Sequence, residues 1–334
     1  MTRRAILLAG GAVMAVAVGV ASFAIVRGPD DGSARARWQG RAAGAPTGSA
    51  GAPVGTSGGS STGPAAGTAS ADPSVSCDPW GCPQQRRFAA ATSLISTRPG
   101  LLGVVVRDRR TGAVWQAGSS GHVMWASSTI KLALATSLLE RARTGEITLD
   151  AAAHRQIAAM FAVSDDRAAD ALWDRYGRDA QVPRFQQVYG MTGLTFVPGF
   201  PRRWGFIKAS AQDLQRLISY VLDRLDAADR AYVVGAMRDV GAIQRWGVWA
   251  AGAALRPGTK DGWSIESDTG GDHWCTSTVG FAGPDERYAV AVMYHLLPGD
   301  GIGAGVRAVS DVVATIFGAA TPAQVTVPDP ATGR

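Results

Sequence analysis

The residues of this chain that could carry out chemistry are two lysines and the serines that accompany them. Only three lysines occur among the 334 residues, and every other basic residue is arginine. Lys131 follows Ser128 by three residues in an S-x-x-K run, and Lys260 opens a K-x-G run that ends at Gly262. Arginine stays protonated, whereas a buried lysine can lose its proton and act as a base. Such a lysine can activate a serine hydroxyl for nucleophilic attack.

The spacing of Ser128 and Lys131 suits this chemistry if a helix begins at Ser128, as the apolar run to Gly145 predicts. Residues three apart share one face of a helix, so the amine can reach the hydroxyl. The helix N-terminus also favours negative charge at Ser128 and offers a backbone N–H to an oxyanion. The pair alone arises often by chance. It gains weight because an S-D-D run at Ser164 and the run at Lys260 follow in order.

The elements that must position these residues follow a pattern of strands, then helices, then strands, then a helix. Turn residues at 108–112 predict a hairpin of strands 101–107 and 113–117. Helices are predicted over residues 128–144, 150–161, 165–176, 210–225, 228–239 and 306–317, and strands over 260–266, 274–281 and 287–296. We therefore expect an α+β fold, with an antiparallel sheet built from both chain ends and an inserted all-helical lobe. A groove between the two is the expected place for a site.

The three runs, in this order and frame, resemble the S-x-x-K, S-D-N and K-T-G signature of class A β-lactamases and penicillin-binding proteins. The resemblance implies that Ser128 is the nucleophile and Lys131 its base. It implies that Ser164 relays a proton to the leaving group, and that Lys260 supports this relay and binds the substrate carboxylate. It also implies an oxyanion hole formed by the N–H groups of Ser128 and Trp263.

Three departures from the family pattern accompany this resemblance, which spans about residues 85–318. Asp166 stands where S-D-N has Asn, and Asp261 stands before Gly262 where K-T-G has Thr. Both add negative charge beside a site expected to bind an anion, and like charges repel strongly at short range. Class A enzymes also carry a glutamate that activates the deacylating water, whereas residues 190–206 contain no acid. We assign Asp166, Asp261 and Gly262 to substrate binding and expect poor β-lactam turnover.

The N-terminus carries an export or anchoring signal. Residues 5–26 are uncharged and mostly apolar, long enough to span a bilayer of about 30 Å. Arg3 and Arg4 precede them, which favours a cytoplasmic N-terminus with the remainder outside. We expect residues 1–27 to be an uncleaved single-pass anchor. The alternative is a cleaved twin-arginine-type signal, and both interpretations export the rest of the chain. No cysteine lies nearby to support a lipid anchor.

The remaining chain divides by composition into three parts. Residues 28–76 are dominated by Ala, Gly, Pro, Ser and Thr, which cannot bury enough apolar surface to form a core. We expect a disordered linker there, a folded domain over residues 77–318, and a flexible tail over residues 319–334. Cys77 and Cys82 bracket a turn-like tetrapeptide at the start of the domain, and in an exported protein this spacing predicts a disulfide.

The other cysteine, the histidines and the tryptophans give weaker signals. Cys275 is expected to be a buried thiol in a strand. The four histidines match no zinc spacing: His122, His154, His273 and His295. Five tryptophans fall in segments expected to line the groove, where they could stack on sugar or peptide unless they pack in the core: Trp204, Trp246, Trp249, Trp263 and Trp274.

Net charge limits the partners. The chain carries +6, of which residues 1–76 account for +3 through six Arg and three Asp, leaving +3 for the folded part. This charge is too small and too scattered to indicate nucleic-acid binding. We expect a monomer with no cofactor and no metal, a small-molecule or peptide substrate of the cell envelope, and membrane contact through residues 5–26.

Three functions are compatible with these features. The first is an extracytoplasmic serine hydrolase that forms an acyl-serine intermediate on an envelope amide or ester. The second is a non-catalytic module that binds a cell-wall fragment or a partner on the same fold. The third is an authentic class A β-lactamase, which would need a deacylation base that the sequence does not supply.

Overall fold

The structure, a computed structural model, describes residues 79–267 and 271–328. The predicted membrane segment 5–26 and the predicted linker 28–76 lie outside the described residues, so both stay predictions. Within the described part of the chain, no helix is long and apolar enough to cross a membrane.

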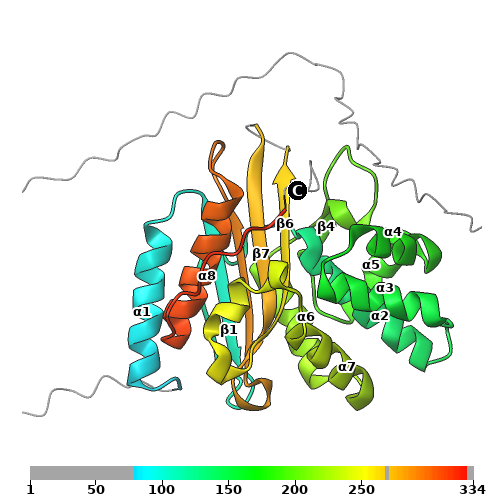
Figure 1. Cartoon of the computed structure of the whole chain (residues 1–334), viewed down its shortest axis with the longest axis horizontal. Helices are drawn as coiled ribbons and strands as arrows, with labels where there is room; N and C mark the ends of the chain where they lie inside the picture. Colours follow the sequence, from blue (N-terminus) through cyan, green and yellow to red (C-terminus); the bar gives the residue numbers. More distant parts are fainter. Residues whose placement is uncertain (1–78, 268–270, 329–334) are drawn as a thin grey trace, which may run out of the picture. The chain divides into compact units, whose positions relative to one another are not determined.

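A five-stranded antiparallel sheet forms the centre of the described fold, in the order β2-β1-β8-β7-β6. Its strands are β1 (Leu101–Asp108), β2 (Val114–Gly118), β6 (Gly258–Glu266), β7 (His273–Ala282) and β8 (Tyr288–His295). The first two strands form the predicted hairpin. The last three strands join this hairpin because β8 pairs with β1. The sheet is therefore completed from both ends of the domain, as expected, and β6 is one of its edges (Figure 1).

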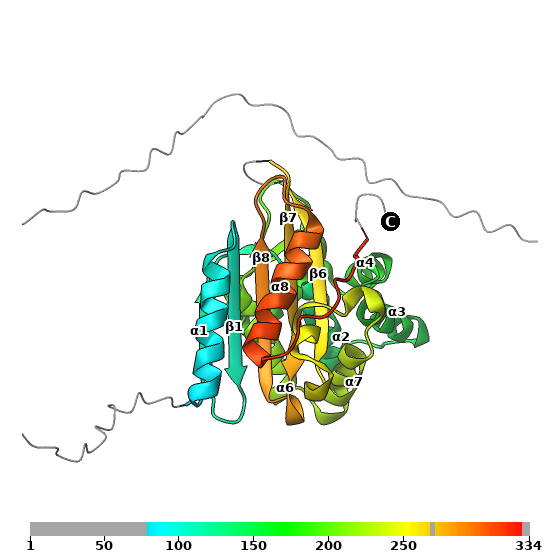
Figure 2. The ribbon, with the colours of Figure 1, turned by 60° about the vertical axis from the view of Figure 1, so that its left-hand side comes forward.

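Helices cover both faces of this sheet. Their bounds are α1 (Cys82–Ser96), α2 (Lys131–Arg143), α3 (Ala151–Ala162), α4 (Asp166–Arg175), α5 (Val182–Gln187), α6 (Ala211–Asp223), α7 (Ala227–Arg238) and α8 (Ile302–Phe317). The first and last helices pack side by side on one face, while α2 to α7 form a lobe on the other (Figures 1 and 2). This arrangement confirms the α+β fold with an inserted helical lobe.

Side-chain caps explain where several helices begin. The carboxylate of Asp150 accepts a hydrogen bond from the Ala153 N–H at 2.8 Å, which fixes the start of α3. The same device at Asp165 starts α4. Ser210 and Asp213 form a capping box at α6, each side chain accepting from the backbone of the other. The sequence predicted all three starts because these caps need only local chain geometry.

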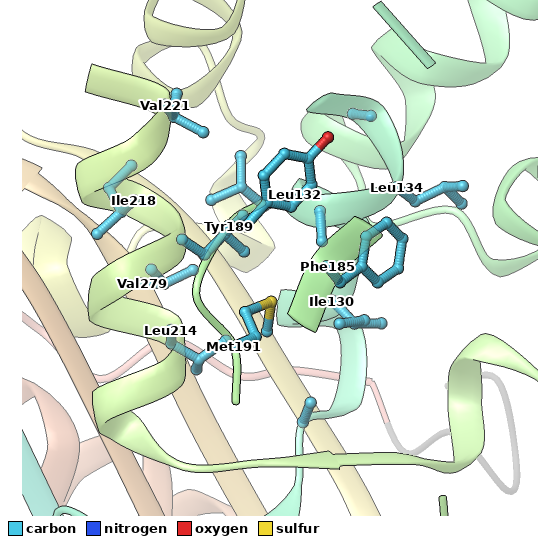
Figure 3. Packing of buried hydrophobic residues seen from close by; sticks show 14 of the residues in the cluster. Ile130, Leu132, Leu134, Phe185, Tyr189, Met191, Leu214, Ile218, Val221 and Val279 are labelled. Carbon is cyan, nitrogen blue, oxygen red and sulfur yellow. The ribbon is translucent and has the colours of Figure 1, made fainter. Parts of the chain in front are cut away.

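Two hydrophobic clusters hold the layers together. The larger lies between the sheet and the helical lobe, where Ile130, Leu132, Met191 and Leu214 gather near Val279 of β7 (Figure 3). The second lies between the sheet and the pair α1 and α8. The segment that carries Ser128 is thus anchored directly in the larger core, because Ile130 and Leu132 are almost fully buried.

Three features differ from the prediction. Helix α1 was not expected, and neither was a small sheet of β3 (Met124–Trp125), β5 (Ile207–Ala209) and β4 (Thr195–Phe196), whose strands are too short to show a period. The tail was expected to be flexible from residue 319, but residues 319–328 run back over the domain (Figure 2). Val327 is buried, and the Pro328 carbonyl accepts a hydrogen bond from the Trp263 indole at 2.8 Å. The folded domain therefore extends beyond residue 318, where the sequence predicted its end.

The cysteine predictions have separate outcomes. Cys275 is a buried thiol in β7, as expected. Its thiol donates to the Trp125 carbonyl at 3.3 Å and so joins β7 to β3. Cys82 begins α1, but Cys77 lies outside the described residues, so their pairing stays a prediction.

Candidate active site

Ser128 lies in a short 3-10 turn, Ser127–Ile130, that leads directly into α2. The α-helix itself begins at Lys131, three residues later than predicted. In a 3-10 turn residues three apart eclipse each other, so Ser128 and Lys131 still share one side. Ser127 has a positive φ of 50°, an uncommon conformation for a residue other than glycine. Such strain is frequent at functional sites, and here it sits immediately before Ser128.

Lys131 is buried, with 1 % of its side chain exposed. Its Nζ donates to the Asp166 carboxylate at 2.5 Å and to the Ser164 carbonyl at 2.6 Å, and it lies 3.4 Å from the Ser164 hydroxyl. Burial lowers the pKa of Lys131, and the neighbouring Asp166 charge only partly opposes this effect. The structure therefore gives Lys131 the environment that a lysine base requires.

Ser164 joins this lysine to the second one. The Lys260 Nζ donates to the Ser164 hydroxyl at 2.9 Å, to Gln244 Oε1 at 2.5 Å and to the Asp261 carbonyl at 2.7 Å. Complete burial, together with the nearby charge of Lys131, holds the pKa of Lys260 well below its ordinary value. Ser164 also has a positive φ of 59°. One serine hydroxyl thus lies within reach of two buried amines, brought from α2 and from β6.

Gly262 brings the edge strand against the Ser128 turn. A Cβ placed on Gly262 would lie 2.7 Å from the Ser128 backbone nitrogen and 2.9 Å from that of Thr129. Only glycine allows such a close approach of two backbones. Trp263 follows on the same edge strand, so its backbone is the next to pass Ser128. The two N–H groups predicted for the oxyanion hole belong to backbones that this contact holds together.

The two unusual aspartates lie in different places. Asp166 is largely exposed, with 63 % of its side chain accessible, and its carboxylate lies on Lys131. Asp261 is fully buried, and its Oδ1 accepts from Thr259 and Thr278, each at 2.6 Å. Alternate residues of a strand point to opposite faces, so Asp261 points away from the side where Lys260 reaches Ser164. The expected contact of the Asp261 carboxylate with substrate is therefore a wrong prediction.

Two site residues were missed or not assigned from the sequence. The Trp204 ring lies over the Lys131 amine, 4.5 Å from Nζ to the ring centroid, and its indole donates to Asp170 at 2.9 Å. It belongs to the acid-free segment 190–206, and it was expected only as one of five tryptophans that could line the groove, without a contact to Lys131. Gln244 is fully buried beside Lys260, and no local pattern marks it.

Sequence comparisons agree with this geometry. The profile of the Beta-lactamase enzyme family matches residues 86–156. A protein named "Putative lipoprotein LppW", from Mycobacterium tuberculosis and Mycobacterium bovis, is 31 % identical over 225 residues, which cover 64 % of this chain and 69 % of the relative. The chain belongs to the β-lactamase and penicillin-binding protein superfamily.

Solved structures share this β-lactamase-like fold. An ancestral class A β-lactamase is similar with a TM-score of 0.56 at 20 % identity, covering 70 % of this chain and 99 % of the other. PBP-A is similar with a TM-score of 0.56 at 18 % identity, covering 70 % of this chain and 95 % of the other. At these identities the likeness concerns the fold alone. The site around Ser128 must therefore be argued from its own contacts.

Proposed function

We propose that this β-lactamase-like chain is an extracytoplasmic serine hydrolase that works through an acyl-serine intermediate. The observation that carries the proposal is the position of the Ser164 hydroxyl, within 3.4 Å of the Lys131 amine and 2.9 Å of the Lys260 amine. Both amines are buried, and burial lowers the pKa of each. A site that only packed side chains would gain nothing from two buried lysines, since burying a charge is costly.

The proposed acylation starts at the Ser128 hydroxyl. The neutral Lys131 amine takes the proton of Ser128 Oγ as that oxygen attacks the substrate carbonyl carbon. The carbonyl oxygen becomes an oxyanion, and the N–H groups of Ser128 and Trp263 donate to it. When the C–N or C–O bond breaks, the Ser164 hydroxyl gives its proton to the leaving group and recovers one from Lys131. Lys260 orients the Ser164 hydroxyl and lowers the activation free energy of this proton transfer.

Deacylation is the step for which the chain is poorly equipped. The segment 190–206 contains no acid, and its Trp204 ring lies against Lys131, the base that a deacylating water would otherwise approach. An acyl group on Ser128 should therefore leave slowly unless the natural acceptor is better placed than water. This favours an envelope amide or ester as substrate over a β-lactam that must be hydrolysed quickly.

An extracytoplasmic location at the membrane fits the relative and the sequence together. The relative's name describes it as a lipoprotein. This chain has no cysteine before Cys77, so its apolar residues 5–26 would serve in place of a lipid anchor. We propose a single-pass anchor with the folded domain outside, or a secreted domain if the segment is cleaved.

A non-catalytic binding module is the second candidate, and Asp166 is the observation that favours it. Its carboxylate lies 2.5 Å from the Lys131 amine, which favours the protonated lysine that cannot act as a base. Because Asp166 is largely exposed, water screens this effect. The hydrolase therefore remains the better-supported proposal.

The test is covalent labelling followed by intact mass. Wild type, Ser128→Ala and Ser96→Ala are each treated with a fluorophosphonate probe and with penicillin G. Ser96 is an exposed serine at the end of α1 and serves as the matched control. We expect one adduct on wild type and on Ser96→Ala, and none on Ser128→Ala. Equal labelling of all three proteins would disprove the mechanism.

Two further outcomes separate the alternatives. A ligand that raises the melting temperature without any adduct would favour the binding module. Nitrocefin turnover well above that of Ser128→Ala would favour an authentic β-lactamase. We expect instead that the penicillin adduct persists, because residues 190–206 supply no acid to activate a deacylating water.

A further inference from the structure

The ends of three strands bring two histidines and a glutamate together away from Ser128. Glu266 is the last residue of β6, His273 the first of β7 and His295 the last of β8. One ligand atom from each lies within 4.8 Å of the others. We propose that these three residues bind one divalent transition-metal ion of the Zn²⁺ type. This site is independent of the proposed hydrolase function.

The distances in the cluster suit an ion better than direct hydrogen bonds. Both histidine Nε2 atoms lie 3.7 Å from the same oxygen, Glu266 Oε2. This separation is too long for a hydrogen bond. It is close to the roughly 3.4 Å that separates two ligands of a tetrahedral zinc ion with bonds of about 2.0–2.1 Å. A contraction of a few tenths of an ångström would bring each histidine nitrogen to this separation from Glu266 Oε2.

The second oxygen of Glu266 is already used, which fixes the carboxylate. Its Oε1 accepts from the Trp125 N–H at 2.9 Å, so Oε2 is the oxygen turned towards the histidines. A hydrogen bond of this kind, from outside the coordination sphere, orients a metal-binding carboxylate. Two imidazoles and one carboxylate are ligands that zinc accepts, with a further position left for water.

Burial gives the ion an electrostatic role. The Glu266 side chain is 0 % exposed and that of His273 is 1 %, whereas His295 is 21 % exposed. A divalent ion beside Oε2 would add a favourable charge interaction for a carboxylate that is removed from water. The partly exposed His295 leaves a route by which the ion could enter. A protonated histidine is the alternative source of charge, and the experiment below distinguishes the two.

The ion would connect the site to the Ser128 turn without taking part in its chemistry. It would join the ends of β6, β7 and β8, and through Glu266 it would hold Trp125, three residues before Ser128. Glu266 lies three residues beyond Trp263 on β6, a separation of about 10 Å along a strand. Ser128→Ala should therefore bind the ion as wild type does.

The experiment uses the full-length chain in mild detergent, stripped with dipicolinate and titrated with ZnCl₂ by calorimetry, with metal content measured by mass spectrometry. We expect one zinc ion per chain. A free ion concentration about 100 times Kd should raise Tm by roughly 5–10 °C. Co²⁺ in place of Zn²⁺ should give the visible absorption bands of tetrahedral coordination.

The variants are His295→Ala, Glu266→Gln and the control His154→Ala, whose histidine is exposed on α3. Loss of a ligand should weaken binding by more than the roughly 10–100-fold caused by losing a partner outside the coordination sphere. His154→Ala should bind as wild type does. If Glu266→Gln fails to fold, the zinc affinity of His295→Ala, which replaces a partly exposed side chain, tests the proposal. Weak binding at several sites, equal loss in His154→Ala, or no zinc uptake by wild type would overturn the proposal.

Discussion

At the scale of single residues, Asp166 has the most direct effect on the proposed base. Its carboxylate is 2.5 Å from the Lys131 amine and favours the protonated form, while burial favours the neutral form. Burial is the stronger of the two, so the pKa of Lys131 is lowered overall. Lys131 becomes a base only above this lowered pKa. Acylation should consequently rise with pH through that value.

Replacing Asp166 by Asn should move this pH profile to lower pH. Without the carboxylate the pKa of Lys131 falls further, so the neutral amine is populated earlier. An exposed ion pair contributes about 1 kcal/mol or less, which corresponds to at most about fivefold faster acylation at neutral pH. The measurement is the rate of penicillin labelling between pH 5 and 9. Asp174→Asn, an exposed change on the same helix, should leave the profile unmoved. An unshifted profile for Asp166→Asn would show that Asp166 does not control the base.

At the scale of elements, strand β6 places alternate residues in different environments. Lys260 reaches the helical lobe, whereas Asp261 is buried on the other side with Thr259 and Thr278. Burial raises the pKa of Asp261 to about 7, against the opposing effect of those two hydrogen bonds. A residue expected to select substrates is thus a residue that makes the strand sensitive to pH.

The contribution of Asp261 to the free energy of unfolding should fall as pH rises from about 4 to about 7. The folded state binds the Asp261 proton throughout this window, whereas the unfolded state has already released it. A shift of about three pKa units corresponds to roughly 4 kcal/mol at most. Asp261→Asn should remove this dependence, so the variant should gain stability relative to wild type between pH 5 and pH 8. Denaturant titrations at both values measure the difference.

Asp108 provides a control of opposite sign. Burial alone would raise its pKa, but the hydrogen bonds and charge of Arg287 bring the pKa of Asp108 below its ordinary value. Its contribution to stability is present above about pH 4 and is lost only below that. Asp108→Asn should therefore differ from wild type by the same amount at pH 5 and pH 8. An Asp261→Asn variant whose stability relative to wild type is the same at pH 5 and pH 8 would contradict the placement of Asp261.

The contact of β6 with the Ser128 turn gives a further prediction for this element. Gly262→Ala would push a Cβ to 2.7 Å from the Ser128 nitrogen, which forces the two backbones apart. We expect labelling of Ser128 to fall by at least tenfold, because loss of one oxyanion donor costs roughly 100–1,000-fold. Gly235→Ala, inside α7 with nothing near its Cβ, should leave labelling unchanged and stabilise the protein slightly. Unimpaired labelling of Gly262→Ala would remove the oxyanion assignment.

At the scale of the whole described domain, the site exists because distant segments meet. Lys131 comes from the helical lobe and Lys260 from the sheet, and Ser164 joins them. The C-terminal segment 319–328 adds a layer over the same strand, since Pro328 accepts from the Trp263 indole. Chain that was expected to be a free tail therefore belongs to the folded unit.

Removing residues 321–334 should destabilise the domain by about 2 kcal/mol, because Val327 loses its burial. The Trp263 indole would also lose its carbonyl partner, so tryptophan fluorescence should shift to longer wavelength. Truncation after Pro328 is the matched control, since it keeps every contact described for this segment. Equal stability of the two truncated proteins, measured by urea unfolding, would show that the segment contributes nothing.

The sequence by itself predicted most of the helices and strands, and it singled out the residues that we propose to be reactive. The caps at Asp150 and Ser210, the hairpin turn at 108–112, and the S-x-x-K run act through neighbours in the chain, so local spacing revealed them. The order of strands and the closing of the sheet by both ends followed from the sequence of strand and helix patterns together with the family resemblance.

Only the tertiary structure decided which long-range neighbours each side chain meets. Asp261 directly follows Lys260 in the chain, yet strand alternation and the pairing with Thr278 bury it on the opposite side of β6 from Ser164. Gln244, Trp204 and the three residues of the proposed metal site come from segments whose proximity no local pattern encodes. Contacts between distant parts of a chain depend on how its layers of helices and strands pack. A single sequence predicts those helices and strands better than it predicts the packing between them.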